Sequence, residues 1–241
     1  MRWLPLEANP DVLNKYLHKL GVENKWQFRD VYGLDEEALK TVPTPVEAVM
    51  LLFPLSNAEK THQLGKEVTD DKVYLIHQTA VNACGTVAIL HALCNNSKVM
   101  DAASGSVLGD FVKKTSGMTP DQRGIAMEED KNLFNIHETL AMEGQTQTPC
   151  RESDTQKHFV TFVVKDGSLY ELDGRRSHPI LHGNSTPHTL LNDASVVIKK
   201  FMERDNSTYV QNGPGKRTDV ISVHYSPAVQ KQLAAFQGSI Q

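Results

Sequence analysis

Cysteine is scarce in this sequence, with three residues in 241, and no two of them form a Cys-x-x-Cys pair. So few cysteines cannot build a disulfide scaffold, and their spacing disfavours a structural zinc site. The N-terminus also lacks the long apolar core of a secretory signal. An odd number of cysteines without such a signal predicts a reducing compartment, and we expect the cytoplasm, with the nucleus as the alternative.

Long apolar runs and an excess of positive charge are missing too. The longest apolar stretch, residues 46–55, is interrupted by Glu47 and Pro54, so we expect no membrane-spanning helix. Twenty-five basic residues stand against 29 acidic residues, a net charge of −4 with histidine neutral. No stripe of lysine and arginine is available to neutralise several phosphates, which argues against a nucleic-acid partner. A basic partner would be tolerated.

The patterns that are present predict a folded protein of alternating helices and strands. Asn9, Pro10 and Gly21 are typical of the beginning and end of a helix over residues 10–20. Residues 86–94 are apolar nearly all round, which predicts a central buried helix. Apolar spacing also predicts helices over 108–113, 131–142 and 192–203, and strands over 48–55, 72–76 and 220–225. We find no internal repeat and no clear domain linker.

Cys84 is the candidate nucleophile. Gly85 and the predicted buried helix follow it directly, so its thiol would lie at a helix N-terminus. Free N–H groups and the helix dipole favour the thiolate there and lower the thiol pKa from about 8.5. A buried structural cysteine is the alternative. Cys94 is expected in the apolar core, and Cys150 lies in a polar segment without an obvious base beside it.

A predicted hairpin supplies a candidate base. Two β-rich runs, residues 158–165 and 168–173, are joined by Asp166-Gly167, the strongest short hairpin signal. A two-residue turn makes His158 and Asp173 diagonal neighbours on one face, with Cα atoms about 7–8 Å apart. A carboxylate there would orient the ring for proton transfer from a thiol. An exposed pair at the sheet end is the alternative, and a one-residue bulge would separate the two side chains.

Gln78 is the candidate oxyanion donor. It lies six positions before Cys84, so its side-chain N–H and the Cys84 backbone N–H could both point at a tetrahedral oxyanion. Such donors are each typically worth about 3–4 kcal/mol of barrier. Taken alone, Gln78 would be an ordinary loop residue. The chain order glutamine, cysteine, histidine, aspartate is that of papain-type thiol hydrolases.

Several separated motifs carry a family resemblance. They are Gln78 with Asn-Ala-Cys-Gly-Thr over 82–86, the hairpin from His158 to Gly174, and Trp-Leu-Pro-Leu-Glu-Ala-Asn-Pro over 3–10. Together they resemble the ubiquitin C-terminal hydrolases, specifically the short L-type isozymes. The resemblance implies an α/β, papain-like cysteine hydrolase fold. A central antiparallel sheet would be flanked by helices, with a knotted backbone and one catalytic domain over 1–241.

The same resemblance assigns roles to the candidate residues. It implies Cys84 as nucleophile, His158 as general base and acid, Asp173 as the orienter of His158, and Gln78 as oxyanion donor. It implies no metal and no organic cofactor. The partner would be ubiquitin, or a ubiquitin-like modifier, whose basic tail ends in Gly-Gly.

The resemblance also gives the polar segment a function. Residues 143–157 look like the family's crossover loop, beneath which the substrate tail threads, so we expect small or unfolded leaving groups. Glu7, Asp11 and Asp30 are candidates for contacting the basic tail, and as ordinary surface acids they would be equally unremarkable. Residues 206–216 look inserted, and 227–241 form an extra tail.

Two other functions use the same residues. A Cys-His-Asp acyltransferase or transamidase would pass the acyl group to an amine in place of water. A non-catalytic ubiquitin-binding module would keep the residues in a misaligned arrangement. The intact set of four residues favours hydrolysis over binding alone.

Overall fold

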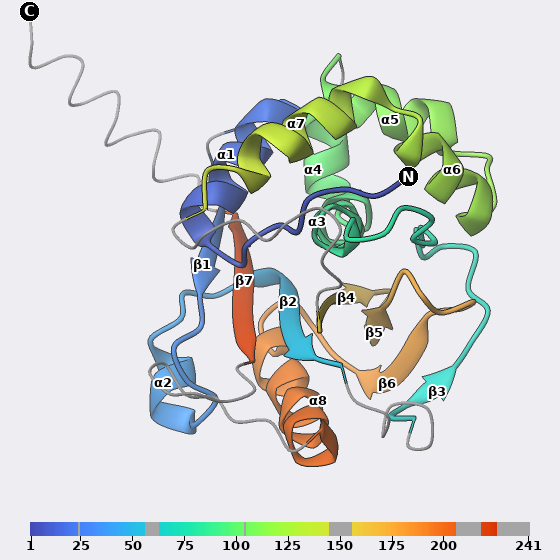
Figure 1. Cartoon of the computed structure of the whole chain (residues 1–241). Coiled ribbons are helices and arrows are strands. Elements are labelled where there is room, and N and C mark those ends of the chain that lie inside the picture. Colours follow the sequence, from blue (N-terminus) through green and yellow to red (C-terminus); the bar gives the residue numbers. More distant parts are fainter. Residues whose placement is uncertain (24, 56–62, 104, 145–155, 206–217, 226–241) are drawn as a thin grey trace, which may run out of the picture.

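The computed structural model describes residues 1–23, 25–55, 63–103, 105–144, 156–205 and 218–225 (Figure 1). Within these ranges a seven-stranded sheet has the order β1-β7-β2-β4-β5-β6-β3, and every neighbouring pair is antiparallel. The strands are β1 Trp26–Asp30, β2 Val46–Pro54, β3 Lys66–Glu67, β4 Lys157–Lys165, β5 Ser168–Leu172, β6 Ile180–Asn184 and β7 Asp219–Tyr225. The predicted α/β class with a central antiparallel sheet is confirmed.

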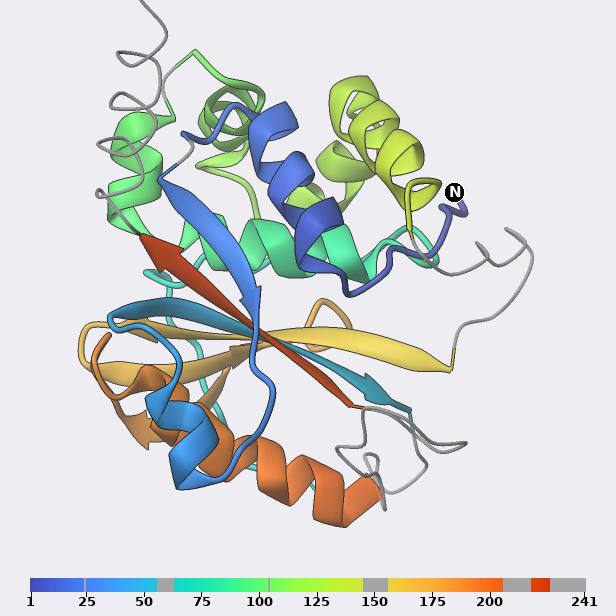
Figure 2. The same ribbon diagram turned by 90° about the vertical axis from the view of Figure 1, so that its left-hand side faces the viewer.

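Helices cover both faces of this sheet (Figure 2). One face carries α1 Pro10–Leu20, α3 Cys84–Cys94, α4 Ser97–Ala102, α5 Val107–Thr115, α6 Pro120–Glu128 and α7 Lys131–Ala141. The other face carries α2 Glu36–Lys40 and α8 Leu190–Asp205. Each face has its own apolar core, and β2 and β4 contribute side chains to both because successive strand residues point to opposite faces.

Local signals set the ends of the predicted helices. Asn9 caps α1 by accepting the Asp11 N–H, and Gly21 ends the helix with a left-handed φ of 82°. Helix α8 begins earlier than predicted because the Thr186 carbonyl already accepts the Leu190 N–H at 2.7 Å. The expected helices over 10–20, 86–94, 108–113 and 131–142 are confirmed, and so are the strands over 48–55 and 220–225.

The predicted strand over 72–76 is wrong. The segment begins in a turn, where the Val73 N–H donates to the Asp70 carbonyl at 3.1 Å, and beyond the turn side chains satisfy backbone groups that a neighbouring strand would otherwise pair. The Tyr74 N–H donates to Asn95 Oδ1 at 2.8 Å, and the Ile76 N–H donates to His91 Nε2 at 2.9 Å. Apolar residues in an extended run indicate burial, but they do not indicate which groups pair with the backbone.

The hairpin register is confirmed. Lys165 pairs with Ser168, and the ladder continues without irregularity to Thr161 opposite Leu172. Asp166 and the following glycine have φ values of 48° and 77°, the left-handed pair that a type I′ turn requires. The irregularity in β5 lies on its β6 side, so it leaves the β4 pairing intact.

Three expected features lie outside the described residues. They are most of the crossover loop with Cys150, the insertion over 206–216, and the tail over 227–241. The knot depends on the path of those segments and therefore stays a prediction. In the described parts of the chain, no helix is long and apolar enough to cross a membrane.

Candidate active site

Helix α3 begins at Cys84, directly after a tight turn. Asn82 has a left-handed φ of 66°, which asparagine tolerates better than most residues. Its buried amide donates to the Trp3 carbonyl at 3.2 Å. Ala83 occupies the N-cap position and offers no side-chain acceptor, so no cap competes for the first N–H groups of the helix. The Cys84 thiol therefore lies where an anion is favoured.

His158 and Asp173 form a buried pair at one end of the β4–β5 hairpin. His158 Nε2 lies 2.7 Å from Asp173 Oδ1, and the two residues are 3% and 1% exposed. The His158 ring packs edge-on against Phe53, its partner on β2, with ring centroids 6.1 Å apart. Hydrogen bonding and packing together hold the ring in one orientation.

Asp173 is further held by Arg175. The Arg175 backbone N–H donates to Oδ1 at 2.9 Å, and its Nη2 donates to Oδ2 at 3.1 Å. Burial would raise the pKa of Asp173, but the charges and hydrogen bonds of His158 and Arg175 hold that pKa well below its usual range. Asp173 is therefore an anion at neutral pH.

Cys84 contacts the other side of the same ring. Because Nε2 of His158 is engaged with Asp173, Nδ1 is the nitrogen left for the hydrogen bond with the thiol. Burial would raise the pKa of Cys84, but the hydrogen bond and charge of His158, together with backbone hydrogen bonds from Phe159 and Gly85, lower it. Burial would lower the pKa of His158, but Asp173 and Cys84 raise it to about 9. The pair favours thiolate and imidazolium.

Gln78 lies at the same small cavity. Its Nε2 donates to the Ala80 carbonyl at 3.0 Å, which leaves the second amide hydrogen available. Its backbone N–H donates to the Gly174 carbonyl at 2.7 Å, and a Cβ at Gly174 would lie 3.0 Å from the Gln78 Cβ. The cavity measures about 210 Å³ and is lined by Leu55, Gln78, Val81, Asn82, Cys84, Lys157, His158 and Arg175. The structure thus brings Cys84, His158, Asp173 and Gln78 together.

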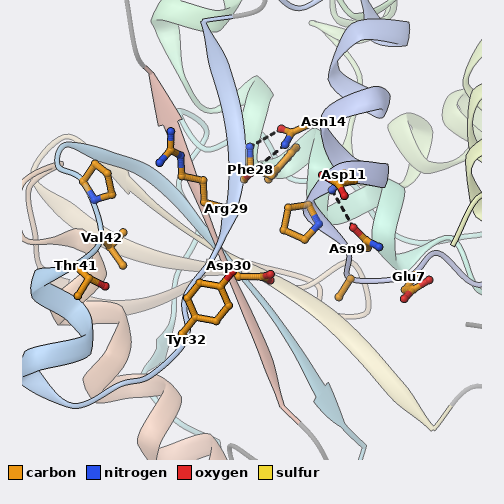
Figure 3. Close-up of a pocket in the computed structure, with 13 residues that line it drawn as sticks. Glu7, Asn9, Asp11, Asn14, Phe28, Arg29, Asp30, Tyr32, Thr41 and Val42 are labelled. Carbon is orange, nitrogen blue, oxygen red and sulfur yellow. Dashed lines mark hydrogen bonds between the residues drawn. The ribbon is translucent and has the colours of Figure 1, made fainter. Parts of the chain in front are cut away.

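Glu7, Asp11 and Asp30 line a second, larger groove. It measures about 820 Å³ and lies between the start of α1 and the end of β1 (Figure 3). Tyr32, 69% exposed, lines the same groove. A Cβ at Gly144 would lie 2.1 Å from Glu7 Oε2, so Glu7 adjoins the start of the predicted crossover loop. The structure thus places the three acids around one groove.

No group of three histidine, cysteine or acidic side chains suited to a metal ion occurs within the described ranges.

Comparison with known proteins identifies the family. The family model described as ubiquitin carboxyl-terminal hydrolase, family 1, matches residues 3–203. The chain belongs to this family. Its members are cysteine-type deubiquitinating enzymes, so the resemblance read from the sequence is confirmed.

Relatives across animals match most of the chain. A ubiquitin carboxyl-terminal hydrolase of Aplysia californica is 45% identical over 206 residues, 85% of this chain and 96% of the relative. Isozyme L1 of Homo sapiens is 41% identical over 212 residues, 85% of this chain and 93% of the relative. The UCH37 catalytic domain of Trichinella spiralis, solved bound to ubiquitin vinyl methyl ester, superposes with a TM-score of 0.73 at 21% identity. That likeness covers 94% of this chain and 97% of that one, and it supports the fold.

Two residues of the candidate site, Arg175 and Asn82, were not predicted from the sequence to have a role there. Arg175 lies two positions after Asp173, and a cation so close to a candidate carboxylate was a usable signal. Asn82 precedes the helix that bears Cys84, and an asparagine before a helix often adopts a special turn conformation. Neither has the residue type of a nucleophile or a base, and only their contacts identify them.

The family's cysteine chemistry predicts unequal thiol reactivity. The pKa of Cys84 is lowered by its surroundings, whereas burial raises the pKa of Cys94 far above its usual range. At pH 7 we expect iodoacetamide to modify Cys84 at least about 100-fold faster than Cys94, because only the thiolate reacts. Peptide mass mapping across pH measures both rates. A Cys84 rate that rises only above pH 8.5, as for a free cysteine, would contradict the lowered pKa.

Proposed function

We propose that this chain is a deubiquitinating thiol hydrolase that releases small or unfolded adducts from the C-terminal glycine of ubiquitin. A ubiquitin-like modifier is the alternative substrate. The observation that carries the proposal is the continuous hydrogen-bonded order of Cys84, His158 and Asp173 at the start of α3. The relatives are named ubiquitin carboxyl-terminal hydrolases, and the UCH37 catalytic domain of Trichinella spiralis was solved bound to ubiquitin vinyl methyl ester; both support ubiquitin as the substrate.

The proposed acylation begins from the ion pair. The Cys84 thiolate attacks the carbonyl carbon of the terminal glycine, and the tetrahedral oxygen takes the negative charge. The Cys84 backbone N–H and the Gln78 amide donate to this oxyanion. His158 then gives its Nδ1 proton to the leaving amine or thiol as the bond to the adduct breaks. A thioester between ubiquitin and Cys84 remains.

The proposed deacylation reverses the proton's path. Neutral His158 accepts a proton from water, and the hydroxide attacks the thioester carbonyl. Collapse of the second tetrahedral intermediate breaks the carbon–sulfur bond and expels the Cys84 thiolate beside His158, which already carries the proton taken from water. The carboxyl group of the released ubiquitin then gives its proton to solvent, so the starting ion pair is regenerated. Asp173 keeps its charge throughout, because its low pKa and its contacts with His158 and Arg175 favour the anion.

Size supports the preference for small adducts. The cavity beside Cys84 is only about 210 Å³. We propose that residues 143–157 form the family's crossover loop. The opening beneath such a loop would admit a peptide more readily than a folded protein. We also propose one catalytic domain over 1–241, because β7 lies between β1 and β2 in the sheet although it follows the matched region. A reducing compartment suits a working thiolate.

The second groove is proposed to hold the basic tail of ubiquitin. Exposed ion pairs are worth at most about 1 kcal/mol, so Asp11→Asn or Asp30→Asn should each raise KM roughly two- to fivefold and leave kcat unchanged. Steady-state kinetics at low and high salt measure the effect, which should shrink as salt increases. Glu129→Gln, an exposed acid beyond the end of α6, is the matched control. An equal effect of the control would contradict a specific groove.

Two measurements test the proposed function. The wild-type chain should hydrolyse ubiquitin bearing a fluorogenic C-terminal amide, and ubiquitin bearing a C-terminal electrophile should form an adduct that mass mapping places on Cys84. Reversible binding without adduct would support the binding module. Transfer of ubiquitin to an added amine in preference to water would support the transamidase. Absence of turnover on the amide would overturn the proposal.

A further inference from the structure

A buried hydrogen-bond chain crosses the helical layer behind the active site. The Tyr16 hydroxyl lies 2.7 Å from Thr86 Oγ1, which lies 2.8 Å from His137 Nδ1. His137 Nε2 lies 2.6 Å from the Leu4 carbonyl oxygen. Tyr16, Thr86 and His137 are each 0% exposed. These hydrogen bonds connect α1, α3 and α7 to the N-terminal segment through three fully buried side chains.

The order of donors in this chain follows from its ends. The Leu4 carbonyl can only accept, so Nε2 of His137 donates to it, and in the tautomer that carries its single proton on Nε2 the Nδ1 atom accepts from the Thr86 hydroxyl. The Thr86 oxygen then accepts from Tyr16, whose pKa is raised by burial so that the phenol stays protonated. Each group has one orientation that satisfies its neighbour, which makes the network directional.

Thr86 holds α3 from the side opposite the active site. It lies two residues after Cys84, a rotation of roughly 200° about a helix with 3.6 residues per turn. Cys84 faces β4, where it contacts His158 and Phe159, while Thr86 faces α1 and α7. The first turn of the helix is therefore held from both sides.

A polar contact matters here because α3 is buried all round. Every residue from Gly85 to Leu93 is buried, and apolar packing by itself is non-directional. Two other polar contacts lie further along: Thr161 Oγ1 donates to the Ala88 carbonyl at 2.9 Å, and His91 accepts the Ile76 N–H. Thr86 is the member of this set nearest the nucleophile.

The N-terminal segment links the network to the turn before Cys84. The Trp3 N–H donates to the Val81 carbonyl at 2.9 Å, and Asn82 donates to the Trp3 carbonyl. A Cβ at Gly85 would lie 2.9 Å from the Leu6 Cβ, so the segment also packs tightly on the helix start. The stretch that supplies the Leu4 carbonyl thus also holds the backbone on either side of Cys84.

We propose that Tyr16, Thr86 and His137 are positioning residues that set the rotation and axial position of the first turn of α3. Through it they align the Cys84 thiol and backbone N–H with His158. This inference rests on the proposed role of Cys84 as nucleophile. The three residues touch neither substrate nor reacting atoms, so their effect must appear in kcat and in the reactivity of the thiol.

The test compares three variants. Thr86→Val removes the hydroxyl at nearly constant volume, whereas Thr86→Ser keeps the hydroxyl and removes only the methyl group. Thr161→Val is the matched control, because it removes the hydrogen bond of an equally buried threonine to the same helix further along. A small misplacement of reacting groups can cost up to 10²-fold, and we expect Thr86→Val to lower kcat about tenfold with KM within about twofold. Its Cys84 should also alkylate with iodoacetamide only at higher pH, whereas Thr86→Ser and Thr161→Val should stay near wild type.

The outcomes separate this inference from the proposed function. A wild-type chain that fails to hydrolyse the ubiquitin amide defeats the proposed function, whereas alkylation of Cys84 needs no turnover and still measures its alignment. Equal effects of Thr86→Val and Thr161→Val, or a lower Tm with unchanged kcat and alkylation profile, would overturn the positioning role. If Thr86→Val does not fold, Tyr16→Phe removes only the terminal hydroxyl and should shift both readouts in the same direction. No shift in that variant would also overturn it.

Discussion

Replacing Cys84 with alanine is expected to abolish turnover of ubiquitin bearing a fluorogenic C-terminal amide, with kcat falling at least about 10⁴-fold. The variant has no thiolate to form the thioester, and water would have to attack the amide directly. The Cys84 contribution that raises the pKa of His158 is lost as well, so a smaller fraction of the ring carries the proton that the leaving group needs. Progress curves at saturating substrate measure the loss.

Binding should survive this substitution. Cys84 does not line the acidic groove, so the Kd of the Cys84→Ala variant for ubiquitin should stay close to the wild-type value. Cys94→Ala is the matched control, because Cys94 packs against the core and burial keeps it as the unreactive thiol. Turnover that survives in Cys84→Ala but disappears in Cys94→Ala would contradict the assignment of the nucleophile.

Asp173→Asn is expected to lower kcat about 10³- to 10⁴-fold with little change in KM. The amide removes the negative charge that, with its hydrogen bond, raises the pKa of His158. A less basic ring stabilises the Cys84 thiolate less well, so the pKa of the thiol should rise. The pH dependence of Cys84 alkylation should therefore move to higher pH, together with the loss in kcat.

A second substitution separates catalysis from stability in this prediction. Asp173→Asn also removes the ion pair that Arg175 makes with Asp173, which should lower Tm. In the double variant Asp173→Asn with Arg175→Gln, Tm should recover in part while kcat stays low. Recovery of kcat in the double variant, or an effect on KM alone, would contradict the role of Asp173 as the orienter of His158.

The pairing of His158 with Asp173 could be predicted because it depends on short-range geometry. A two-residue Asp-Gly turn leaves no freedom in register, so the positions of all later pairs follow from the turn itself. The place of Cys84 at the N-terminal end of a buried helix was predictable from the apolar run that follows it, although α3 begins at Cys84, two residues earlier than the predicted 86–94. The family followed from separated motifs in order, and the comparison with relatives confirmed it.

Other parts of the site required the folded chain. The grouping of Glu7, Asp11 and Asp30 depends on α1 packing beside β1. The strand predicted over 72–76 was wrong for the same reason. Backbone N–H groups there donate to side chains of Asn95 and His91, which lie further along the chain, and not to a neighbouring strand.

The hairpin, the buried helix after the cysteine and the motifs of the family can all be read from residues close together in the chain. The packing of β4 against the start of α3, which brings Cys84 to His158, cannot be read in this way and is seen in the folded chain. Only the tertiary structure also placed Thr86 and His137 behind the nucleophile. The two kinds of contact differ in how far apart their residues lie in the sequence. Turn and cap preferences act over a few residues, whereas the contacts that align the thiol join residues far apart in sequence, and packing of the whole core selects them.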